Sequence, residues 1–310
     1  MIKPRPLKYG DTIGVIAPSG HYYNEEKIDM GKKTLEDMGF KVKIGRSCYE
    51  AYGYLSGKDE IRAYDLNSMF EDKEIDGIIC LRGGYGTSRI LDKLDYEVIK
   101  KNPKVYVGFS DITATHIALN QICDLVTFHG PMVTSHMIDD LDNFTKNSLL
   151  NLVMGKEESR CLNNPESEEI GCLYGGKAEG RLTGGNLTLI CNTLGTPYEI
   201  DTKGKILFIE EIREEPYRID RMLTQLCLAG KLQDANGIIL GDWKECIAER
   251  PERSLTLMQV FDDIIKPLKK PTIYNLKSGH CSPMMTLPMG VMVSIDTFKG
   301  EIILKEGATE

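Results

Sequence analysis

A serine stands where an apolar run breaks and a helix-forming run begins, in the stretch VGFSDITATH. Ser110 follows a predicted strand at 104–109 and precedes a predicted helix at 112–122. A tight strand-turn-helix corner projects the hydroxyl outward and points the first helical N–H groups at whatever the oxygen attacks. Nucleophilic attack by Ser110 is one interpretation. The other is that Ser110 and Asp111 only cap the helix, because serine and aspartate are ordinary cap residues and the full G-x-S-x-G pattern is missing.

A glycine-rich loop follows the preceding predicted strand, in the stretch CLRGGYGTSR, residues 80–89. The carboxyl ends of parallel strands meet at one edge of a sheet, so this loop is expected beside Ser110. Glycines let a backbone approach a reacting carbonyl and leave N–H groups for an oxyanion. Phosphate binding is the alternative, but Gly-Gly-Tyr-Gly matches neither G-x-G-x-x-G nor a Walker A loop.

A serine nucleophile needs a base and a group that orients the base. His280 lies in LKSGHCSPMMTLPMG, whose turn-forming residues suggest a presented rather than a packed side chain. His116 falls inside the predicted helix, and His129 and His136 flank GPMVTS. There is no HExxH and no histidine spacing typical of a metal site, so neither a metal nor another cofactor is expected.

Two adjacent acids, Glu210 and Glu211, end the apolar strand KILFIEEI. Side chains alternate along a strand, so only one of the two acids can face His280. Both faces of the strand are apolar, and alternation alone leaves the choice open. The acid that does not orient a histidine is expected to pair with a cation such as Arg218 or Arg221.

In the first half of the chain, predicted strands alternate with predicted helices, and these elements must hold the candidate residues in place. Strands predicted at 12–18, 40–45, 76–82 and 104–109 are separated by helices at 25–39 and 58–72, which is typical of a parallel sheet covered on both faces. The second half is less regular, with few expected parallel crossovers. We therefore predict an α/β fold with a parallel-sheet N-terminal domain, flavodoxin-like or amidotransferase-like, and a smaller mixed, β-rich C-terminal domain. The predicted divisions are domain 1–155, a polar linker 156–171 and domain 172–310.

Composition narrows the class of partner. The 310 residues carry a formal net charge of −8, so nucleic acid is a poor first guess. No stretch approaches about 18 uninterrupted apolar residues and the N-terminus has no apolar leader region, so neither export nor a membrane span is expected. Nine cysteines without paired spacing predict reduced, mostly buried thiols in a cytoplasmic protein.

Several blocks together resemble the LD-carboxypeptidase (muramoyltetrapeptide carboxypeptidase) family of serine peptidases. They are LRGGYGTSRILDKLDYEVIKKNPKVYVGFSDITATHIAL, TFHGPM, GRLTGGNLTLI, ILFIEEIREEPYRIDRMLTQL and SGHCSPMMTLPMG. The likeness extends from GDTIGVIAPSG to LPMG, nearly the whole chain, and the blocks stand in family order.

The resemblance implies a Ser-Glu-His triad formed by Ser110, Glu210 and His280, with the nucleophile in one domain and the charge pair in the other. It further implies that the N–H groups of Gly84 and Asp111 form the oxyanion hole. Arg82, Gly83 and Tyr85 are candidate substrate contacts; Arg82 could instead form a structural ion pair. Two departures from the family pattern are Phe109, where tyrosine is frequent, and Cys281, where glycine is common.

The implied reaction removes the terminal D-alanine from an L,D-peptide bond of murein tetrapeptides through an acyl-enzyme, in cytoplasmic cell-wall recycling. The expected partner is therefore a small peptide. A homodimer is expected as well, although no residue pattern carries that expectation. Two rivals stay open: a microcin C immunity-type hydrolase of aminoacyl-nucleotide-like toxins, for which Trp243 could stack a base or simply pack in the core, and a non-catalytic binding protein.

Overall fold

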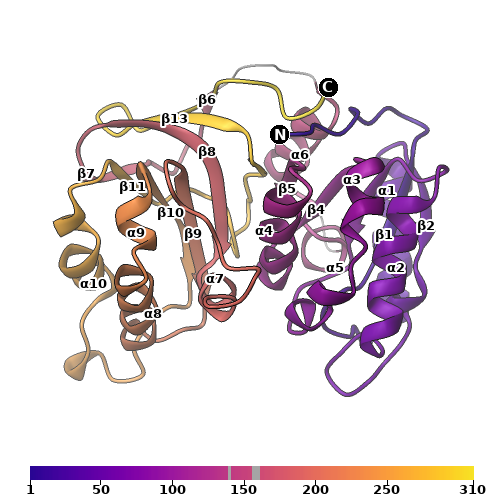
Figure 1. Cartoon of the computed structure of the whole chain (residues 1–310), viewed down its shortest axis with the longest axis horizontal. Helices are drawn as coiled ribbons and strands as arrows, with labels where there is room; N and C mark the ends of the chain where they lie inside the picture. The colour runs from indigo at the N-terminus through magenta and orange to yellow at the C-terminus, as the bar shows by residue number, and fades with distance from the viewer. Residues whose placement is uncertain (139–140, 156–160) are drawn as a thin grey trace. The chain divides into compact units, whose positions relative to one another are not determined.

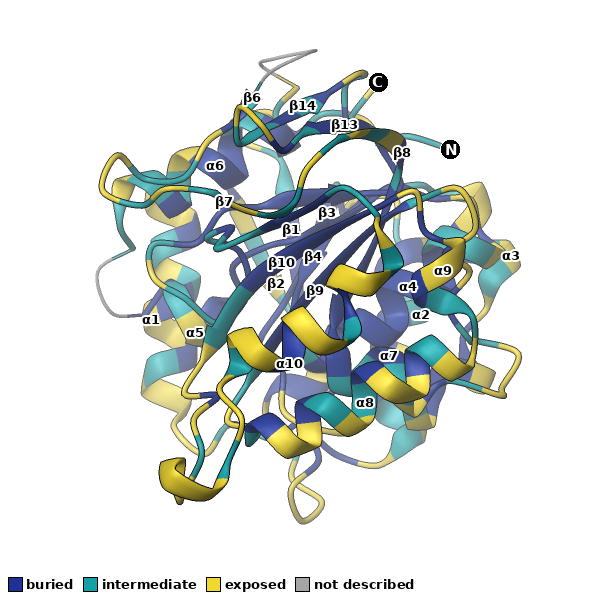
Figure 2. Ribbon diagram, turned by 90° about the vertical axis from the view of Figure 1, so that its left-hand side faces the viewer, coloured by how far each residue is buried: buried dark blue, intermediate teal, exposed yellow. Residues whose placement is uncertain are grey.

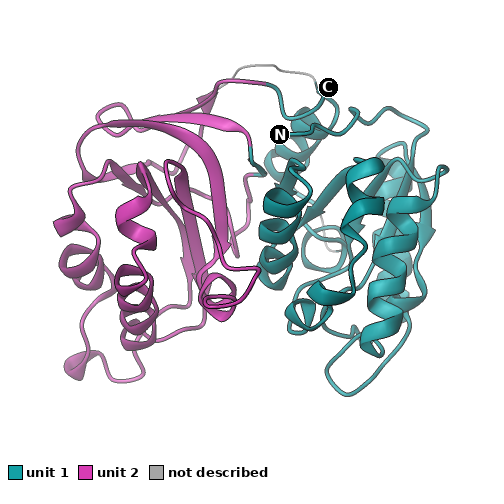
Figure 3. Ribbon diagram, viewed as in Figure 1, with its two compact units in different colours: residues 1–157, 286–290, 307–310 teal, residues 158–285, 291–306 magenta. Residues whose placement is uncertain are grey.

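The computed structural model describes residues 1–138, 141–155 and 161–310. The chain forms two compact units, drawn in two colours in Figure 3. Unit 1 comprises residues 1–157, 286–290 and 307–310, and unit 2 comprises residues 158–285 and 291–306. The chain thus returns twice to unit 1 near its end. The predicted domain boundaries stay a prediction, and residues 156–160 of the predicted linker lie outside the described residues.

Unit 1 is built on a six-stranded sheet of order β12-β5-β4-β3-β1-β2, of which Figure 1 labels β1, β2, β4 and β5. Its strands are β1 Thr12–Ile16, β2 Lys41–Ile44, β3 Gly77–Cys80, β4 Val105–Gly108, β5 Thr127–His129 and β12 Leu287–Met289. The first five are parallel, and their order β2-β1-β3-β4-β5 is the flavodoxin-like one. β12 adds antiparallel to β5. β3 and β4 are buried along their whole length, because both faces of such a sheet are covered.

Some of the helices of unit 1 begin at a side chain that caps them. The helices are α1 Glu25–Asp37, α2 Asp59–Glu71, α3 Tyr96–Lys101, α4 Thr113–Ile122, α5 Val133–His136 and α6 Asn143–Val153. The side chain of Asn24 caps α1, and that of Asp95 caps α3. α2 differs from an ordinary amphipathic helix, because it buries Arg62 and Asp65 together with its apolar residues.

Unit 2 contains an eight-stranded sheet of order β6-β14-β13-β8-β9-β10-β11-β7. Its strands are β6 Cys161–Leu162, β7 Gly171–Tyr174, β8 Lys177–Asn186, β9 Ile206–Ile212, β10 Gly237–Lys244, β11 Thr272–Tyr274, β13 Met292–Asp296 and β14 Glu301–Leu304. The strands β8, β9, β10 and β11 are parallel neighbours, so the expectation of few parallel crossovers was wrong. The remaining pairs are antiparallel, which makes the sheet mixed. The predicted α/β fold class, with a parallel sheet and a second, mixed sheet, is confirmed.

Four α-helices lie in the described part of unit 2. They are α7 Leu187–Asn192, α8 Pro216–Leu228, α9 Lys231–Asp234 and α10 Leu257–Ile264. α8 buries Ile219, Leu223 and Leu226, whose spacing of three and four residues gives one apolar face. Figure 2 shows the alternation of buried and exposed turns along α8 and α10. α10 begins with a capping box in which Thr256 and Gln259 satisfy each other's backbone N–H groups.

The nine cysteines are all free thiols, but only four of them, Cys48, Cys80, Cys123 and Cys246, are buried. The expectation of mostly buried thiols was therefore too strong, and Cys172 is exposed. No helix in the described part of the chain is long and apolar enough to span a bilayer.

Candidate active site

The corner at Ser110 has the backbone strain of a nucleophile elbow. β4 ends at Gly108, and one turn of 3₁₀ helix, Ser110–Ile112, leads into α4. Ser110 has φ +63°, a left-handed conformation that costs energy for a residue other than glycine. A Cβ on Gly108 would lie 2.8 Å from Cγ2 of Ile112, so the corner closes only because glycine stands there. Strain of this kind is often stored at catalytic positions.

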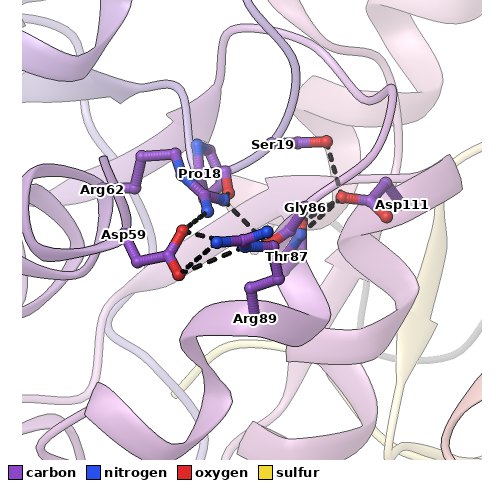
Figure 4. Close-up of polar contacts among 8 residues, drawn as sticks. All are labelled: Pro18, Ser19, Asp59, Arg62, Gly86, Thr87, Arg89 and Asp111. Carbon is purple, nitrogen blue, oxygen red and sulfur yellow. Dashed lines mark hydrogen bonds and ion pairs between the residues drawn. The ribbon is translucent and has the colours of Figure 1, made fainter. Parts of the chain in front are cut away.

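Helix capping does not explain Asp111. No side chain caps α4, and the Asp111 carboxylate, in a residue only 1% exposed, turns toward two other loops (Figure 4). Its Oδ2 accepts hydrogen bonds from Oγ of Ser19 at 2.5 Å, and from N and Oγ1 of Thr87 at 2.8 and 2.5 Å. Burial raises the pKa of Asp111, and the bonds from Ser19 and Thr87 oppose that rise in part.

The glycine-rich loop lies against the nucleophile. A Cβ on Gly83 would come within 2.9 Å of Cβ and 3.1 Å of Oγ of Ser110, and within 3.5 Å of N of Asp111. Gly84 has φ +122°, and its own missing Cβ would lie 3.2 Å from Cα of Gly20. The loops after β1, β3 and β4 therefore touch through glycine backbone at the carboxyl edge of the sheet, as predicted for residues 80–89.

The three candidate substrate contacts of this loop differ in their surroundings. Nη1 of Arg82 donates to the carbonyl of His21 at 2.8 Å, and its Nε donates to the carbonyl of Gly83 at 3.1 Å. Tyr85 is 51% exposed, and its ring meets that of Tyr54 edge-on at 5.6 Å between centroids. Arg82 thus supports the loop through backbone carbonyls, while Tyr85 is about half exposed.

In unit 2 the strand-end acid Glu210 meets His280. Oε2 of Glu210 lies 2.6 Å from Nδ1 of His280, and the Glu210 side chain is fully buried. Gly279, at φ +116°, makes the approach possible, because a Cβ there would lie 2.7 Å from the same Oε2. Burial lowers the pKa of His280, but the charge and hydrogen bond of Glu210 outweigh it, so the pKa is raised above the usual histidine value. A carboxylate on Nδ1 fixes the tautomer that leaves Nε2 to take a proton.

Glu211 points to the other face of β9 and has different partners. Its Oε1 accepts from Nδ2 of Asn186 at 2.8 Å, and its Oε2 accepts from N and Oγ1 of Thr188 at 2.9 and 2.7 Å. The predicted pairing of this acid with Arg218 or Arg221 was wrong for Arg218, which bonds Glu214 and Tyr217. Burial raises the pKa of Glu211.

The chain matches known proteins along almost its whole length. Residues 13–130 match the LD-carboxypeptidase N-terminal domain, and residues 179–295 match the LD-carboxypeptidase C-terminal domain. A relative from Bacillus subtilis (strain 168), named a probable murein peptide carboxypeptidase, is 44% identical over 309 residues that cover 99% of this chain and 96% of the relative. This chain belongs to the LD-carboxypeptidase family.

Two solved structures of family members have the same fold over almost the whole chain. MccF in complex with glutamyl sulfamoyl guanosine gives a TM-score of 0.93 at 25% identity and covers all of both chains. Muramoyltetrapeptide carboxypeptidase from Oxalobacter formigenes gives a TM-score of 0.85 at 29% identity and covers 96% of this chain and 99% of that one. The family therefore includes both carboxypeptidases and an immunity protein.

Three further histidines, His116, His129 and His136, contact other residues of unit 1. His116 is buried, and its Nε2 lies 2.8 Å from the carbonyl oxygen of Gly108. Burial lowers its pKa to about 4, which keeps it neutral at ordinary pH. His129 and His136 each meet the ring of Phe109 edge-on. The described residues contain no group of His, Cys, Asp and Glu side chains that could hold a metal.

The sequence reasoning missed the side chains that hold the loops around Ser110, namely Ser19, Asp59, Arg62 and Thr87. One signal was available: Ser19 follows the first strand of a parallel sheet and so belongs to the same edge as Ser110. Arg62 gave no such signal, because a charged residue in a helix is normally expected on its solvent face.

Proposed function

We propose that this protein is a serine-type LD-carboxypeptidase that removes the terminal D-alanine from murein tetrapeptides. The observation that carries the proposal is the 2.6 Å contact between His280 and the buried Glu210, an oriented base of the kind a serine nucleophile requires. The strained corner at Ser110 and the name of the Bacillus subtilis relative support the same reaction. Ser110, Glu210 and His280 then form the catalytic triad.

In the proposed reaction, Nε2 of His280 takes the hydroxyl proton of Ser110 as Oγ attacks the carbonyl of the last peptide bond. The N–H groups of Gly84 and Asp111 donate to the oxyanion. The imidazolium then protonates the leaving nitrogen, D-alanine departs, and the rest of the peptide stays esterified to Ser110. Water activated by the same histidine hydrolyses the ester. The pair with Glu210 stabilises the imidazolium in both halves of the reaction.

The proposal places the activity in cytoplasmic recycling of the cell wall and takes the active form to be a homodimer. Neither a metal nor a cofactor enters any step. The test is mass spectrometry of a murein tetrapeptide after incubation with the protein in excess EDTA. Loss of one alanine, abolished in Ser110→Ala, is the expected result. Activity that disappears in EDTA and returns with zinc would contradict the serine mechanism.

A second candidate is a hydrolase of the microcin immunity type, favoured by the fold shared with MccF. Trp243 gives this candidate little support. It stands opposite Glu211 in the register of β9 and β10, hence on the face away from Glu210, and its ring packs edge-on against Phe261 at 5.0 Å. Incubation with an aminoacyl sulfamoyl nucleoside beside the tetrapeptide decides between the substrates, and a fluorophosphonate probe that leaves Ser110 unlabelled would favour the non-catalytic binding protein.

A further inference from the structure

Two loops beside Ser110 are tied together from two sides. One follows β1 and carries Pro18 and Ser19, and the other follows β3 and carries Gly86 and Thr87. Gly20 of the first loop donates its N–H to the carbonyl of Gly83 in the second at 3.3 Å. Because Gly83 also lies against Ser110, the position of these loops sets where the N–H of Gly84 lies relative to the attacking oxygen.

The first tie is the carboxylate of Asp111, the residue after the nucleophile. One oxygen, Oδ2, accepts from Ser19 of the β1 loop and from two groups of Thr87 in the β3 loop. Hydrogen bonds to an ionised acceptor are shorter and stronger than neutral ones. A single buried carboxylate thus joins both loops to the strained corner that carries Ser110.

The second tie is the guanidinium of Arg62, which reaches the same two loops from α2. Its Nη1 donates to the carbonyl of Pro18 at 2.5 Å and to that of Gly86 at 2.8 Å. Its Nη2 bonds Oδ1 of Asp59 at 2.5 Å, and Asp59 also binds the exposed Arg89 (Figure 4). Arg62 is 0% exposed, and a buried charge is tolerated only when paired and hydrogen-bonded in this way.

We propose that Arg62 and the Asp111 carboxylate form a two-ended clamp that positions the oxyanion loop against Ser110. Neither end needs to touch the substrate: both are positioning groups that act through backbone N–H groups. This inference rests on the proposed function, because it assigns a task to the oxyanion donors of the serine mechanism. It adds that the geometry of these donors is set by a buried arginine of α2, which is held by Asp59 of the same helix.

The clamp predicts a particular kinetic signature. An oxyanion donor acts on the transition state more than on the bound substrate, so its displacement lowers kcat and leaves KM little changed. Losing one donor outright has cost about 10² to 10³ in kcat in other serine enzymes, and a loosened loop should cost less. We expect kcat to fall by about tenfold to a hundredfold when one end of the clamp is broken.

Arg62→Lys tests one end of the clamp. Lysine keeps the charge, but its single ammonium lacks the planar fork that serves Pro18, Gly86 and Asp59 together. The control is Arg89→Gln, which removes the outer partner of Asp59 without touching either of the two loop carbonyls. Rates are divided by the amount of serine titrated with a fluorophosphonate, so that unfolded protein does not count. We expect kcat to fall in Arg62→Lys and to stay within about twofold of wild type in Arg89→Gln.

Thr87→Val tests the Asp111 end of the clamp. It also keeps the proposal testable if Arg62→Lys does not fold. It removes the hydroxyl bond to Asp111 with almost no change in shape. Thr145→Val is the matched control, because Thr145 gives the same kind of bond, from Oγ1 to Oδ2 of Asp142 at 2.6 Å, at the start of α6. Both variants should lose similar thermal stability, but only Thr87→Val should lose kcat, by about tenfold.

Equal kcat per titrated serine in Thr87→Val and Thr145→Val would overturn the clamp, as would a rise in KM without a fall in kcat. The proposed function fails in a different way, by absence of both tetrapeptide cleavage and fluorophosphonate labelling in the wild-type protein, and the clamp falls with it. If the wild type labels but does not cleave the tetrapeptide, the rate constant of labelling replaces kcat in the same comparison. If the wild-type protein cleaves the tetrapeptide and Thr87→Val cleaves it equally well, the clamp is rejected and the proposed function stands.

Discussion

The corner at Ser110 in unit 1 and the His280–Glu210 pair in unit 2 are held in place by different kinds of force. Around Ser110, the buried side chains of Arg62 and Asp111 bond to the loops after β1 and β3, and much of the contact is to backbone. At His280, a short hydrogen bond joins two side chains, and the nearby charges change the pKa of the imidazole. The bonds around Ser110 fix the positions of backbone groups, whereas the contact with Glu210 sets the protonation equilibrium of His280.

This difference separates the expected effects of substitution. Displaced oxyanion donors lower the rate at every pH, because no titrating group in the proposed reaction has changed. A changed environment at His280 moves the pH at which the base becomes neutral. Variants of the two regions should therefore differ in the shape of their pH profiles and not only in their rates.

The largest expected effect belongs to Glu210→Gln. The amide keeps the shape of the side chain but cannot stabilise the imidazolium, and disabling the orienting carboxylate of a serine protease has cost about 10⁴-fold in kcat. We expect a loss of that order in tetrapeptide cleavage, with the protein still folded by circular dichroism.

Glu211→Gln is the matched control on the neighbouring residue. It disturbs a buried acceptor for Asn186 and Thr188, so we expect it to cost about 1–3 kcal/mol of stability while kcat stays within tenfold of wild type. A larger loss of kcat in Glu211→Gln than in Glu210→Gln would show that the wrong acid has been assigned to the triad.

The next effect in size is that of Gly279→Ala. The added methyl group would overlap Oε2 of Glu210, and φ +116° is a conformation that alanine avoids. We expect kcat to fall about a hundredfold as the carboxylate leaves its place. Gly204→Ala serves as the control, because Gly204 has φ +70° with open space around it and should lose only about 1–2 kcal/mol of stability. Equal kcat in the two variants would mean that the approach of Gly279 to Glu210 has no part in catalysis.

The sequence was sufficient for four strands of unit 1, for its long helices at 25–39 and 58–72 and for the strand-turn-helix corner, because these depend on local periodicity and turn residues. Thus the helix predicted at 58–72 is α2, Asp59–Glu71, and the strand predicted at 104–109 contains β4, Val105–Gly108. The choice between Glu210 and Glu211 was beyond such reasoning. β9 is buried on both faces, so the pattern of apolar residues does not mark which face meets the His280 loop.

The errors came from contacts between residues distant in sequence. Arg218 was one expected partner of Glu211, but Asn186 and Thr188, at the end of β8 and the start of α7, satisfy that carboxylate instead. Arg62 was overlooked for the same reason. Its partners Pro18 and Gly86 are 44 and 24 residues away, and only the completed sheet edge brings their carbonyls to the guanidinium.

The pH dependence follows from the raised pKa of His280. The base must be neutral, so kcat/KM should rise with pH through an apparent pKa above about 6.5. The stability that the pair gives is fully present below the unfolded-state pKa of about 6.5, and it is lost as the pH rises through the higher folded-state value. Proton NMR of His280 measures the pKa directly. In Glu210→Gln the burial of the imidazole is no longer outweighed by that charge, and the pKa should fall. An unchanged value in that variant would contradict the electrostatic role of Glu210.

The smallest expected effect comes from Lys244, at the end of β10. It stands opposite Ile212 in the register with β9, and Ile212 shares a face with Glu210, so Lys244 lies on the face of the sheet that carries Glu210. Its charge works against the rise in the pKa of His280. We expect Lys244→Gln to raise the apparent pKa of His280, and to do so less at high salt because salt screens the interaction of an exposed charge.

Lys305→Gln removes the same charge from another exposed position of unit 2, and Arg89→Gln removes a cation from unit 1. Both should leave the apparent pKa of His280 where it is, because neither charge is among those that act on the imidazole most strongly. Two results together would distinguish the two regions. The apparent pKa of His280 should shift in Lys244→Gln and in neither control, whereas Thr87→Val should lower kcat and leave that pKa unchanged. Equal shifts in Lys244→Gln and Lys305→Gln would instead mean that the histidine responds to the net charge of the protein, and that the neighbours of Glu210 on β9 and β10 do not tune it individually.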